Sequence, residues 1–468
     1  MSSSSISASE GRAPRPRIAR HIAGYLAAIG TLVVLAVPAF LGLVALGHGL
    51  TLDMAYDKVA LRLTEKMALA ETREGRRILV FSGSSGFFDF RAADVEAATG
   101  LATVNLATHS GNGLAFLLWQ AETVARPGDI VILPLEDGYY SEPGVTYYGA
   151  NVSLAMGAGF FDDLPLQDKL VYLRNIHIRR LLKVAVARLG IGTYELEPGW
   201  TLPINANGDM EAQTPDPAAL AALIAEVSGQ RANGFTFVPP AFERIRDFVA
   251  RMRQRNVAVV FTLPGIMETA APTEAQIAAL AYRIDQTGAT FLPLRQNGAI
   301  PAEMMFDTIY HAAVPGARVY TAQVILALCE RGDELGFACS SEAINAAETL
   351  LVRAAERGYL IAADAELAAI GPLGEKLFAA LEAGRTYRFS LARLRGCRDE
   401  LVIRADGTGT LDIAIAGKPV APLIAPGPLA EVRRQLTGAP GLVTVQITVR
   451  EDAQLHLATV LRESSCKG

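Results

Sequence analysis

The sequence has few of the histidine, cysteine and charged residues that metal sites and nucleic-acid-binding surfaces use. Among 468 residues, six are histidine, four are cysteine and 19% are charged. The net charge is −5 at pH 7, and no long basic run follows the amino-terminal segment. Clustered Lys and Arg are typical of nucleic-acid-binding surfaces, so we do not expect nucleic acid as a partner. No Cys/His cluster has metal-ligand spacing and no Gly-x-x-x-x-Gly-Lys loop occurs, so we expect no metal or other cofactor.

The few cysteines lie in the last third of the chain, at Cys329, Cys339, Cys397 and Cys466. An even number permits two disulfides in an oxidising compartment, with three possible connectivities. Four buried free thiols is the other interpretation, and the spacing does not decide between the two.

One long uncharged segment follows an arginine-rich start. Residues from Ile22 to Leu46 carry no charge, and about 20 apolar residues suffice to cross a bilayer as a helix. A cleavable signal peptide, cut near Ala45-Leu46-Gly47, is the competing interpretation. Its apolar region normally has only about 7–15 residues, so the length favours an anchor.

The orientation of this anchor follows from the positive-inside rule. Arginines precede the span, and the basic residues after it are interleaved with acids. We therefore predict a cytoplasmic tail (1–20), a transmembrane anchor (21–49) in the inner (cytoplasmic) membrane, and a periplasmic or otherwise extracytoplasmic remainder.

Residues 50–335 alternate between short apolar runs and helical patterns, which is typical of an α/β fold with a parallel sheet in three layers. A segment of about 140–235, rich in Gly, Pro and Asn, is interpreted as an insertion covering one end of the sheet. The predicted strands are Arg77–Phe81, Thr103–Leu106, Asp129–Leu133, Val257–Thr262 and Thr290–Pro293. The predicted helices are 53–70, Arg91–Ala98, Leu114–Ala125, Phe242–Arg255, Glu274–Gln286 and Tyr320–Cys329.

The last part of the chain, 340–468, has a different character. We predict a helical linker, with helices over Ser341–Ala355 and Pro372–Glu382, followed by an antiparallel, sandwich-like β domain. Turns such as Asp406-Gly407 separate its strands. The predicted strands are Tyr387–Leu391, Glu400–Arg404, Thr410–Ala414, Val443–Thr448 and Leu455–Leu461.

A run of small residues, Ser82-Gly-Ser-Ser-Gly86, directly follows the first predicted strand. Such a turn presents a side chain at the carboxyl end of the sheet, where open α/β sheets place ligands. A serine there also receives help from backbone N–H groups and the next helix dipole. Most turns of this kind are only turns, so the segment needs partners elsewhere in the chain.

A base for such a serine is found more than 200 residues later, in Asp307-Thr-Ile-Tyr-His311. A nucleophilic serine needs a base within hydrogen-bond reach, and the base needs an orienting group. His311 and Asp307 are suited to those roles, although a histidine bonded locally to its aspartate at a helix entry is the structural alternative.

A third block, Asn105-Leu-Ala-Thr-His-Ser-Gly-Asn-Gly113, follows the second predicted strand. Its backbone N–H groups are candidates for an oxyanion site. Ser110 or Asn112 capping the next helix is the alternative.

In content and order, the segments Ile78–Gly86, Ala102–Gly113 and Asp307–Ala317 resemble the SGNH/GDSL hydrolase superfamily. The similarity is greatest to its membrane-anchored branch, which includes alginate O-acetylation and teichoic-acid D-alanylation proteins. The resemblance implies a catalytic set of Ser84, Asp307 and His311. Ser84 is preferred to its neighbours because Gly83 precedes it. The implied oxyanion donors are Ser84, Gly111 and Asn112, with Glu136 and His109 contacting the substrate.

Two features depart from the family pattern. Its third block usually carries Gly-x-Asn-Asp, whose asparagine donates to the oxyanion, but Glu136 stands near that place, and an ionised carboxylate cannot donate. The oxyanion site is then either built differently, using Asn105 or Asn112, or incomplete. In addition, Asp307 lies four residues before His311, where Asp-x-x-His is the usual spacing. The acidic pairs Glu136-Asp137 and Asp162-Asp163 also suggest a glycosidase, but adjacent acids in loops are usually solvated surface.

These patterns lead to an expected function and one rival. We expect a membrane-anchored serine esterase or O-acyltransferase, with acetyl as the acyl group and a cell-surface or secreted polysaccharide as substrate. The resemblance implies a membrane O-acyltransferase or an export complex as partner. The rival is a non-catalytic relative that binds glycan or serves as a scaffold in such a complex.

Overall fold

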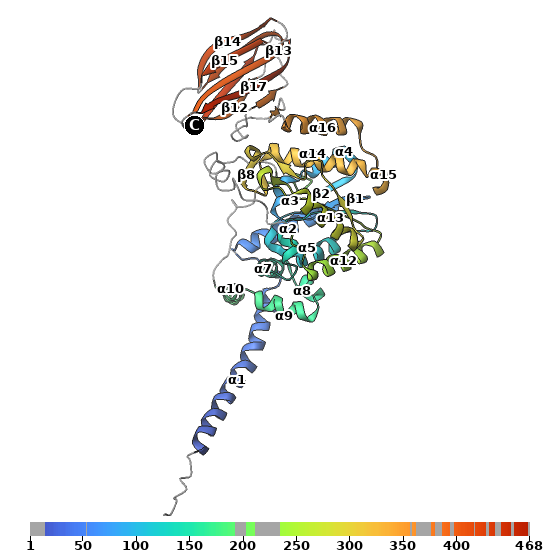
Figure 1. The fold of residues 1–468 in the computed structure, drawn as a ribbon. Coiled ribbons are helices and arrows are strands. Elements are labelled where there is room, and N and C mark those ends of the chain that lie inside the picture. Colours follow the sequence, from blue (N-terminus) through green and yellow to red (C-terminus); the bar gives the residue numbers. More distant parts are fainter. Residues whose placement is uncertain are drawn as a thin grey trace, which may run out of the picture.

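The computed structural model describes residues 15–52, 54–191, 203–210 and 235–355, and, in the last part of the chain, 358–361, 376–379, 386–393, 397–415, 417–426, 430–435, 441–450 and 454–466. Figure 1 shows a long amino-terminal helix, a mixed α/β body and a sheet of carboxy-terminal strands. Residues 1–14 of the expected tail, and 192–202 and 211–234 of the expected insertion, lie outside the described residues.

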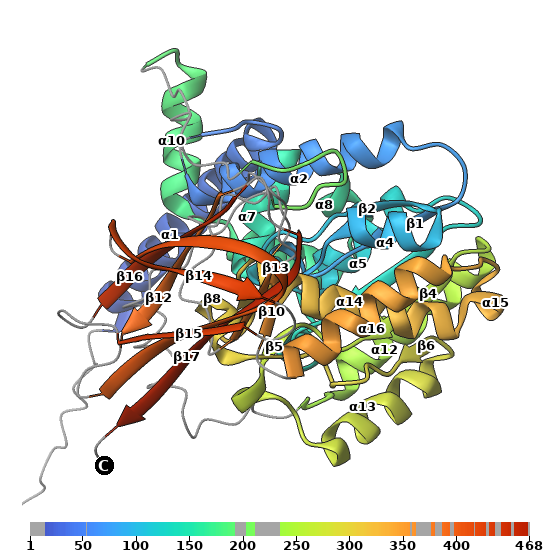
Figure 2. The same cartoon turned by 90° about the horizontal axis from the view of Figure 1, so that it is seen from above.

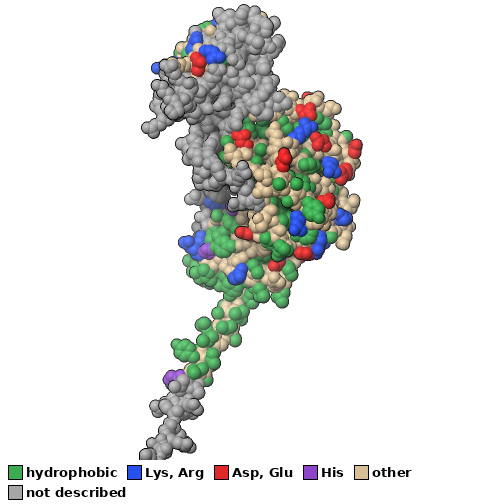
Figure 3. Space-filling view, viewed as in Figure 1, with side chains coloured by type: hydrophobic (Ala, Val, Ile, Leu, Met, Phe, Trp, Pro, Cys, Tyr) green, Lys and Arg blue, Asp and Glu red, His purple; other side chains and the backbone are tan. Residues whose placement is uncertain are grey.

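The amino-terminal helix α1 (Arg15–Gly47) carries the long uncharged segment. Among the residues that the structure describes, His21–Gly47 is the one helix long and apolar enough to cross a membrane. Most of its large apolar side chains are exposed, and Figure 3 shows them in green on the helix that projects from the α/β body. The expected span is therefore present as a helix of suitable length and composition.

The body is built on a parallel sheet of five strands in the order β2-β1-β3-β4-β6. This confirms the predicted α/β class. All five strands lie within one to two residues of their predicted positions, because short runs of buried Ile, Val and Leu bounded by polar turns favour central parallel strands. Their bounds are β1 (Arg77–Val80), β2 (Ala102–Asn105), β3 (Ile130–Pro134), β4 (Ala258–Thr262) and β6 (Thr290–Leu292).

Helices cover both faces of this sheet, giving the three layers visible in Figure 1. On one side lie α3 (Ser84–Asp89), α4 (Ala92–Thr99), α14 (Val314–Glu330) and α16 (Ser341–Ala355). On the other lie α2 (Ala55–Thr72), α5 (Gly113–Val124), α12 (Pro239–Gln254) and α13 (Glu274–Thr287). Two helix boundaries have a local cause in the sequence. Helix α4 ends at Gly100 (φ 70°), and α13 begins with a capping box of Thr273 and Gln276.

An ion pair fixes the start of β1 inside the body. Arg77 and Asp129 have 0% and 1% exposed side chains, and Arg77 Nη2 lies 2.5 Å from Asp129 Oδ2. Arg77 also donates to the carbonyls of Ala70 (2.6 Å) and Val124 (3.0 Å). The end of α2, the end of α5 and the start of β3 are thereby bound to one guanidinium.

Short elements occupy the region expected to be an insertion. They are α6 (Gly138–Ser141), α7 (Tyr147–Met156), α8 (Gly159–Asp163), α9 (Leu166–Asn175) and α10 (Ile178–Arg188). Helix α7 packs on α2 and on the 3-10 turn η1 (Ser110–Asn112), so this segment covers the loop that follows β2. Further short elements follow β4: β5 (Ile266–Met267), η2 (Glu268–Ala270), β7 (Ala299–Ile300), η3 (Ala302–Met304), β8 (Met305–Thr308), β9 (His311–Ala312) and α15 (Gly332–Leu335).

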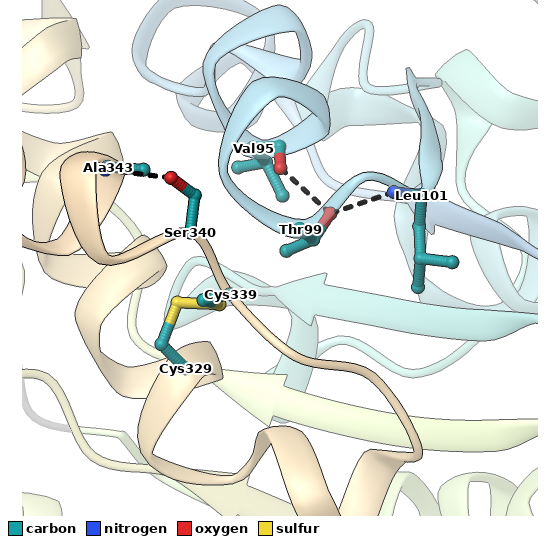
Figure 4. The surroundings of a disulfide bond; sticks show 7 residues. All are labelled: Val95, Thr99, Leu101, Cys329, Cys339, Ser340 and Ala343. Carbon is teal, nitrogen blue, oxygen red and sulfur yellow. Dashed lines mark hydrogen bonds between the residues drawn. A yellow bond between two sulfur atoms is a disulfide. The ribbon is translucent and has the colours of Figure 1, made fainter.

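A disulfide joins Cys329, at the end of α14, to Cys339, just before α16. Figure 4 shows it beside Ser340, whose hydroxyl accepts a hydrogen bond from the Ala343 N–H (3.4 Å). The bond closes a short segment onto the helical layer. For these two cysteines the interpretation as free thiols is therefore wrong.

The carboxy-terminal strands form one largely antiparallel sheet around the long strand β13 (Cys397–Ile415), as Figure 2 shows from above. Two predictions are wrong here. Asp406-Gly407 is not a turn but an irregularity within β13, where its pairing to β17 shifts register. Residues 376–379 of the helix expected over Pro372–Glu382 are strand β11, because a short apolar run does not distinguish helix from strand. The other strands are β10 (Gly358–Ile361), β12 (Thr386–Arg393), β14 (Lys418–Pro426), β15 (Ala430–Gln435), β16 (Gly441–Val449) and β17 (Gln454–Cys466).

Candidate active site

The candidate site lies at the carboxyl ends of β1 and β3. The chain runs from β1 to β2 on one side of the sheet and returns past β1 to β3 on the other, so the strand order reverses between β1 and β3. Ligands of open α/β sheets bind in the crevice at such a switch point. The segment Phe81–Ser84 follows β1, and Leu135–Gly138 follows β3, so these two loops meet there.

The three serines after β1 differ in their surroundings. Ser82 is buried, and its hydroxyl donates to the Pro134 carbonyl at 2.5 Å. Ser85 is fully buried, with its Oγ 3.3 Å from that of Ser82. Ser84 is the first residue of α3 and is partly exposed. Of the three hydroxyls, that of Ser84 is the one a substrate can approach from solvent.

Glu136 occupies the amino end of α3. Its Oε1 accepts a hydrogen bond from the Ser85 N–H at 2.9 Å, and the residue is 7% exposed. A Cβ on Gly83 would lie 2.7 Å from this oxygen and 2.8 Å from Ser110, so the turn needs glycine there. Burial is the main cause that raises the pKa of Glu136, against the opposing hydrogen bond from Ser85. Burial therefore favours the neutral acid, which is able to donate.

Asp307 and His311 are in contact, as the sequence predicted. Asp307 Oδ1 lies 2.6 Å from His311 Nδ1, which leaves Nε2 as the free ring nitrogen. The His311 ring stacks on Phe88 with centroids 4.0 Å apart and planes 7° apart. Phe88 is four residues after Ser84 in α3, and residues at that spacing share a helix face. The imidazole therefore lies on the side of α3 that carries Ser84.

Two contacts hold the histidine loop in place. Asp89, fully buried at the end of α3, accepts from the Ala312 N–H at 2.7 Å. Burial raises the pKa of Asp89 well above its ordinary value. Tyr310 donates its hydroxyl to Asp137 at 3.2 Å, joining the same loop to the segment after β3. Neither contact had a sequence signal, because the partners of each are more than 170 residues apart in the chain.

The loop after β2 faces the same site. His109 Nδ1 accepts from the Gly111 N–H at 2.9 Å, and its ring stacks on Tyr148 of α7 at 4.2 Å. Burial lowers the pKa of His109, and nearby His311 lowers it further. The predicted oxyanion donor Gly111 thus has its N–H bonded within the loop. The Asn112 amide donates to Thr108 at 3.1 Å.

Two further residues of this region have structural partners. The Asn105 amide donates to the carbonyls of Gly86 and Phe90, both at 2.9 Å, so Asn105 secures α3 and is not free to bind an oxyanion. Lys66, fully buried in α2, donates to the Ala107 carbonyl at 2.7 Å and lies over the Phe87 ring. Burial lowers the pKa of Lys66 well below its usual range.

The remaining acidic candidates lie elsewhere or have partners. Asp163 accepts from the Trp119 indole at 2.9 Å, and Asp137 caps α6 through the Gly138 N–H. Across the described ranges, no group of three or more His, Cys, Asp or Glu side chains is placed to hold a metal ion.

Comparisons with known proteins add little. No family model and no curated protein matches the chain. The solved structures that match include a family 35 carbohydrate binding module from an environmental isolate (9% identity, 19% of this chain and 77% of that one, TM-score 0.17). They also include a CBM35 from Paenibacillus barcinonensis (18% identity, 18% and 74%, TM-score 0.15) and a family two carbohydrate esterase from Clostridium thermocellum in complex with cellohexaose (15% identity, 20% and 29%, TM-score 0.15).

Proposed function

We propose that this protein is a membrane-anchored, extracytoplasmic serine esterase or O-acyltransferase of the SGNH type. The observation that carries the proposal is the arrangement around α3. Asp307 holds His311 through Nδ1, and the ring of His311 stacks on Phe88, on the helix face of Ser84. A nucleophile, a base and an orienting carboxylate are what acyl transfer needs.

In this reaction Ser84 Oγ attacks the carbonyl carbon of an acyl ester while His311 Nε2 takes the hydroxyl proton. The tetrahedral oxyanion is stabilised by the Ser84 N–H at the amino end of α3. Glu136, whose pKa is raised by burial, donates in place of the family's asparagine when its carboxyl group is protonated. Collapse breaks the ester bond, and His311 returns the proton to the departing alcohol. Water as the second acceptor makes the protein an esterase, and a sugar hydroxyl makes it a transferase.

The substrate class and location follow from the anchor and the resemblance. A helix suited to span the inner membrane, preceded by arginines, keeps the site close to that membrane on its outer side. We propose a cell-surface or secreted polysaccharide as substrate, acetyl as the acyl group, and a membrane O-acyltransferase or export complex as partner. Reporter activity at the carboxy terminus should be found outside the cytoplasm; activity inside would overturn this topology.

Two contacts favour a second candidate function, a non-catalytic glycan-binding or scaffolding subunit. An ionised Glu136 would fill the amino end of α3 as a permanent cap, and the Gly111 N–H is already bonded to His109. In that case the fold and its switch-point crevice serve binding alone.

One assay separates the two functions. The purified full chain is treated with a fluorophosphonate probe and, separately, with p-nitrophenyl acetate. We expect labelling and turnover that are both lost in Ser84→Ala and kept in Ser141→Ala, an exposed serine outside the site. A folded wild-type chain that is neither labelled nor active, and whose glycan binding survives Ser84→Ala, would sink the enzymatic proposal.

A further inference from the structure

Helix α10 (Ile178–Arg188) has two apolar faces on opposite sides. Its inner face holds Arg180, Leu181 and Val184, all at 0% exposure. The outer face holds Ile178 and Leu182, followed beyond the helix end by Leu189, with exposures of 64%, 59% and 73%. These positions repeat at the spacing of one helical stripe. A buried stripe is normal for a surface helix, but a second, exposed stripe of large side chains marks an interaction surface.

The inner face fixes α10 firmly to the body, so its outer face is not exposed by loose packing. Arg180 Nη2 lies 2.7 Å from Asp57 of α2, with both side chains fully buried, and it also donates to the Leu50 carbonyl at 2.9 Å. Burial is the main cause that raises the pKa of Asp57, and the contact with Arg180 opposes it. The ion pair thus ties α10 to α2, and the hydrogen bond to Leu50 ties it to the segment between α1 and α2.

The position of α10 relative to α1 points to its partner. Arg188 donates to the carbonyl of Leu46, near the last residue of α1, at 2.8 and 3.1 Å. Helix α10 is seen end-on in Figure 1 and lengthwise in Figure 2, so it crosses the direction of α1. It therefore lies at the end of the apolar span, in the plane that a membrane surface would take.

Helix α9 (Leu166–Asn175) extends this surface. Leu166 and Leu170, one helical turn apart, are 76% and 62% exposed. Figure 3 shows apolar side chains gathered on the end of the body next to α1, with basic side chains beside them. The charged residues of α10 that are not buried are all basic: Arg179, Lys183 and Arg188. Apolar side chains flanked by Arg and Lys are the composition of helices that lie in an anionic membrane surface.

We infer that the outer faces of α10 and α9 lie in the phospholipid headgroup layer of the membrane that α1 crosses. The occupant is lipid rather than a second copy of the chain, because the surface continues directly from the end of the span and carries only basic charge on α10. This contact would hold the body at a fixed height and tilt, which α1 alone, a single helix, does not do. The inference rests on the anchor and is independent of the catalytic proposal.

The test uses the full chain reconstituted in nanodiscs of phosphatidylcholine and phosphatidylglycerol. An environment-sensitive NBD dye is attached to Leu182→Cys and, as the matched control, to Tyr282→Cys, an exposed position on α13. Wild-type chain treated in parallel gives the background from native thiols. A lipid carrying a nitroxide near the headgroup end of its acyl chain is then introduced as quencher.

We expect blue-shifted emission and severalfold stronger quenching at position 182 than at position 282. Quenching at position 182 should weaken when phosphatidylcholine alone forms the disc, because the basic residues lose their anionic partners. Equal, weak quenching at both positions would overturn the inference. A blue shift at position 182 without lipid quenching would also overturn it and would assign the surface to a protein partner.

Discussion

Replacing Glu136 by Gln or by Ala tests whether this side chain is a neutral donor or an anionic cap. Gln keeps the shape and the oxygen that accepts from Ser85, and it donates at every pH. Ala removes both. In the wild-type chain the pKa of Glu136 is raised, mainly by burial, so the donating acid is present below that raised pKa. The donating proton is lost as the pH rises through the raised pKa of Glu136.

The magnitude follows from the number of bonds involved. One carboxyl oxygen of Glu136 is taken by the Ser85 N–H, so the side chain offers at most one donor to an oxyanion. Loss of one such donor costs roughly 10²–10³ in kcat, or about 2.7–4 kcal/mol. We therefore expect Glu136→Ala to lose about that factor at pH values below the raised pKa of Glu136, and to approach the wild type above it, where the wild type has itself lost the donor. Glu136→Gln should keep most of the activity and lose the wild-type decline at high pH.

The assay is the pH profile of p-nitrophenyl acetate turnover and of fluorophosphonate labelling, with Glu142→Gln as an exposed control. A stability measurement accompanies it. Since the native state holds the Glu136 proton more tightly than the unfolded chain, its contribution to stability falls as pH rises from about 4.3 through the raised pKa. Glu136→Gln should lack that fall. An unchanged high-pH decline in Glu136→Gln, or full activity in Glu136→Ala, would refute the role.

Three further predictions concern stability and covalent structure. Arg77→Met leaves Asp129 buried without its cation and should cost about 3–5 kcal/mol of unfolding free energy in urea titrations. The double variant Arg77→Met/Asp129→Leu should recover most of that loss. No recovery in the double variant would contradict the pairing. The register of β13 and β17 places Cys397 opposite Cys466, so we expect a second disulfide between them. Non-reducing mass spectrometry should detect the two peptides linked, whereas alkylation of both thiols would show that the bond does not form. Asp209 accepts from the first N–H groups of α4, and Asp209→Ala should cost about 1–2 kcal/mol in thermal unfolding, whereas a loss near zero would remove it as a cap.

The local features of the candidate site could be predicted from the sequence, but the contacts between distant segments could not. Ser84 was singled out because of Gly83 and the strand before it, and the structure adds that its neighbours Ser82 and Ser85 are buried and bonded. Asp307 and His311 are four residues apart, so their contact is local and was predictable. Phe88, which positions the imidazole, was not, because its partner lies more than 200 residues away.

In the carboxy-terminal part, the sequence predicted the type of structure but not the bounds of the strands. Alternating apolar residues predicted antiparallel strands, and strands are found, but their bounds depend on pairing. Strand β13 continues through Asp406-Gly407, with a shift of register, because β17 pairs with it on both sides of this dipeptide. A dipeptide that often forms a turn stays within the strand here because β17 pairs with it, while β15 and β14 pair with the residues just before and just after it.

The sequence by itself determined the long uncharged segment of α1, the parallel α/β body and the serine turn at the end of its first strand. Each of these rests on local periodicity or on small residues at one place. Only the tertiary structure decided that Glu136 closes the amino end of α3 and that one apolar stripe of α10 is buried while the other remains exposed. The pKa of a side chain and the exposure of a helix face depend on what packs against them, and those neighbours come from distant parts of the chain.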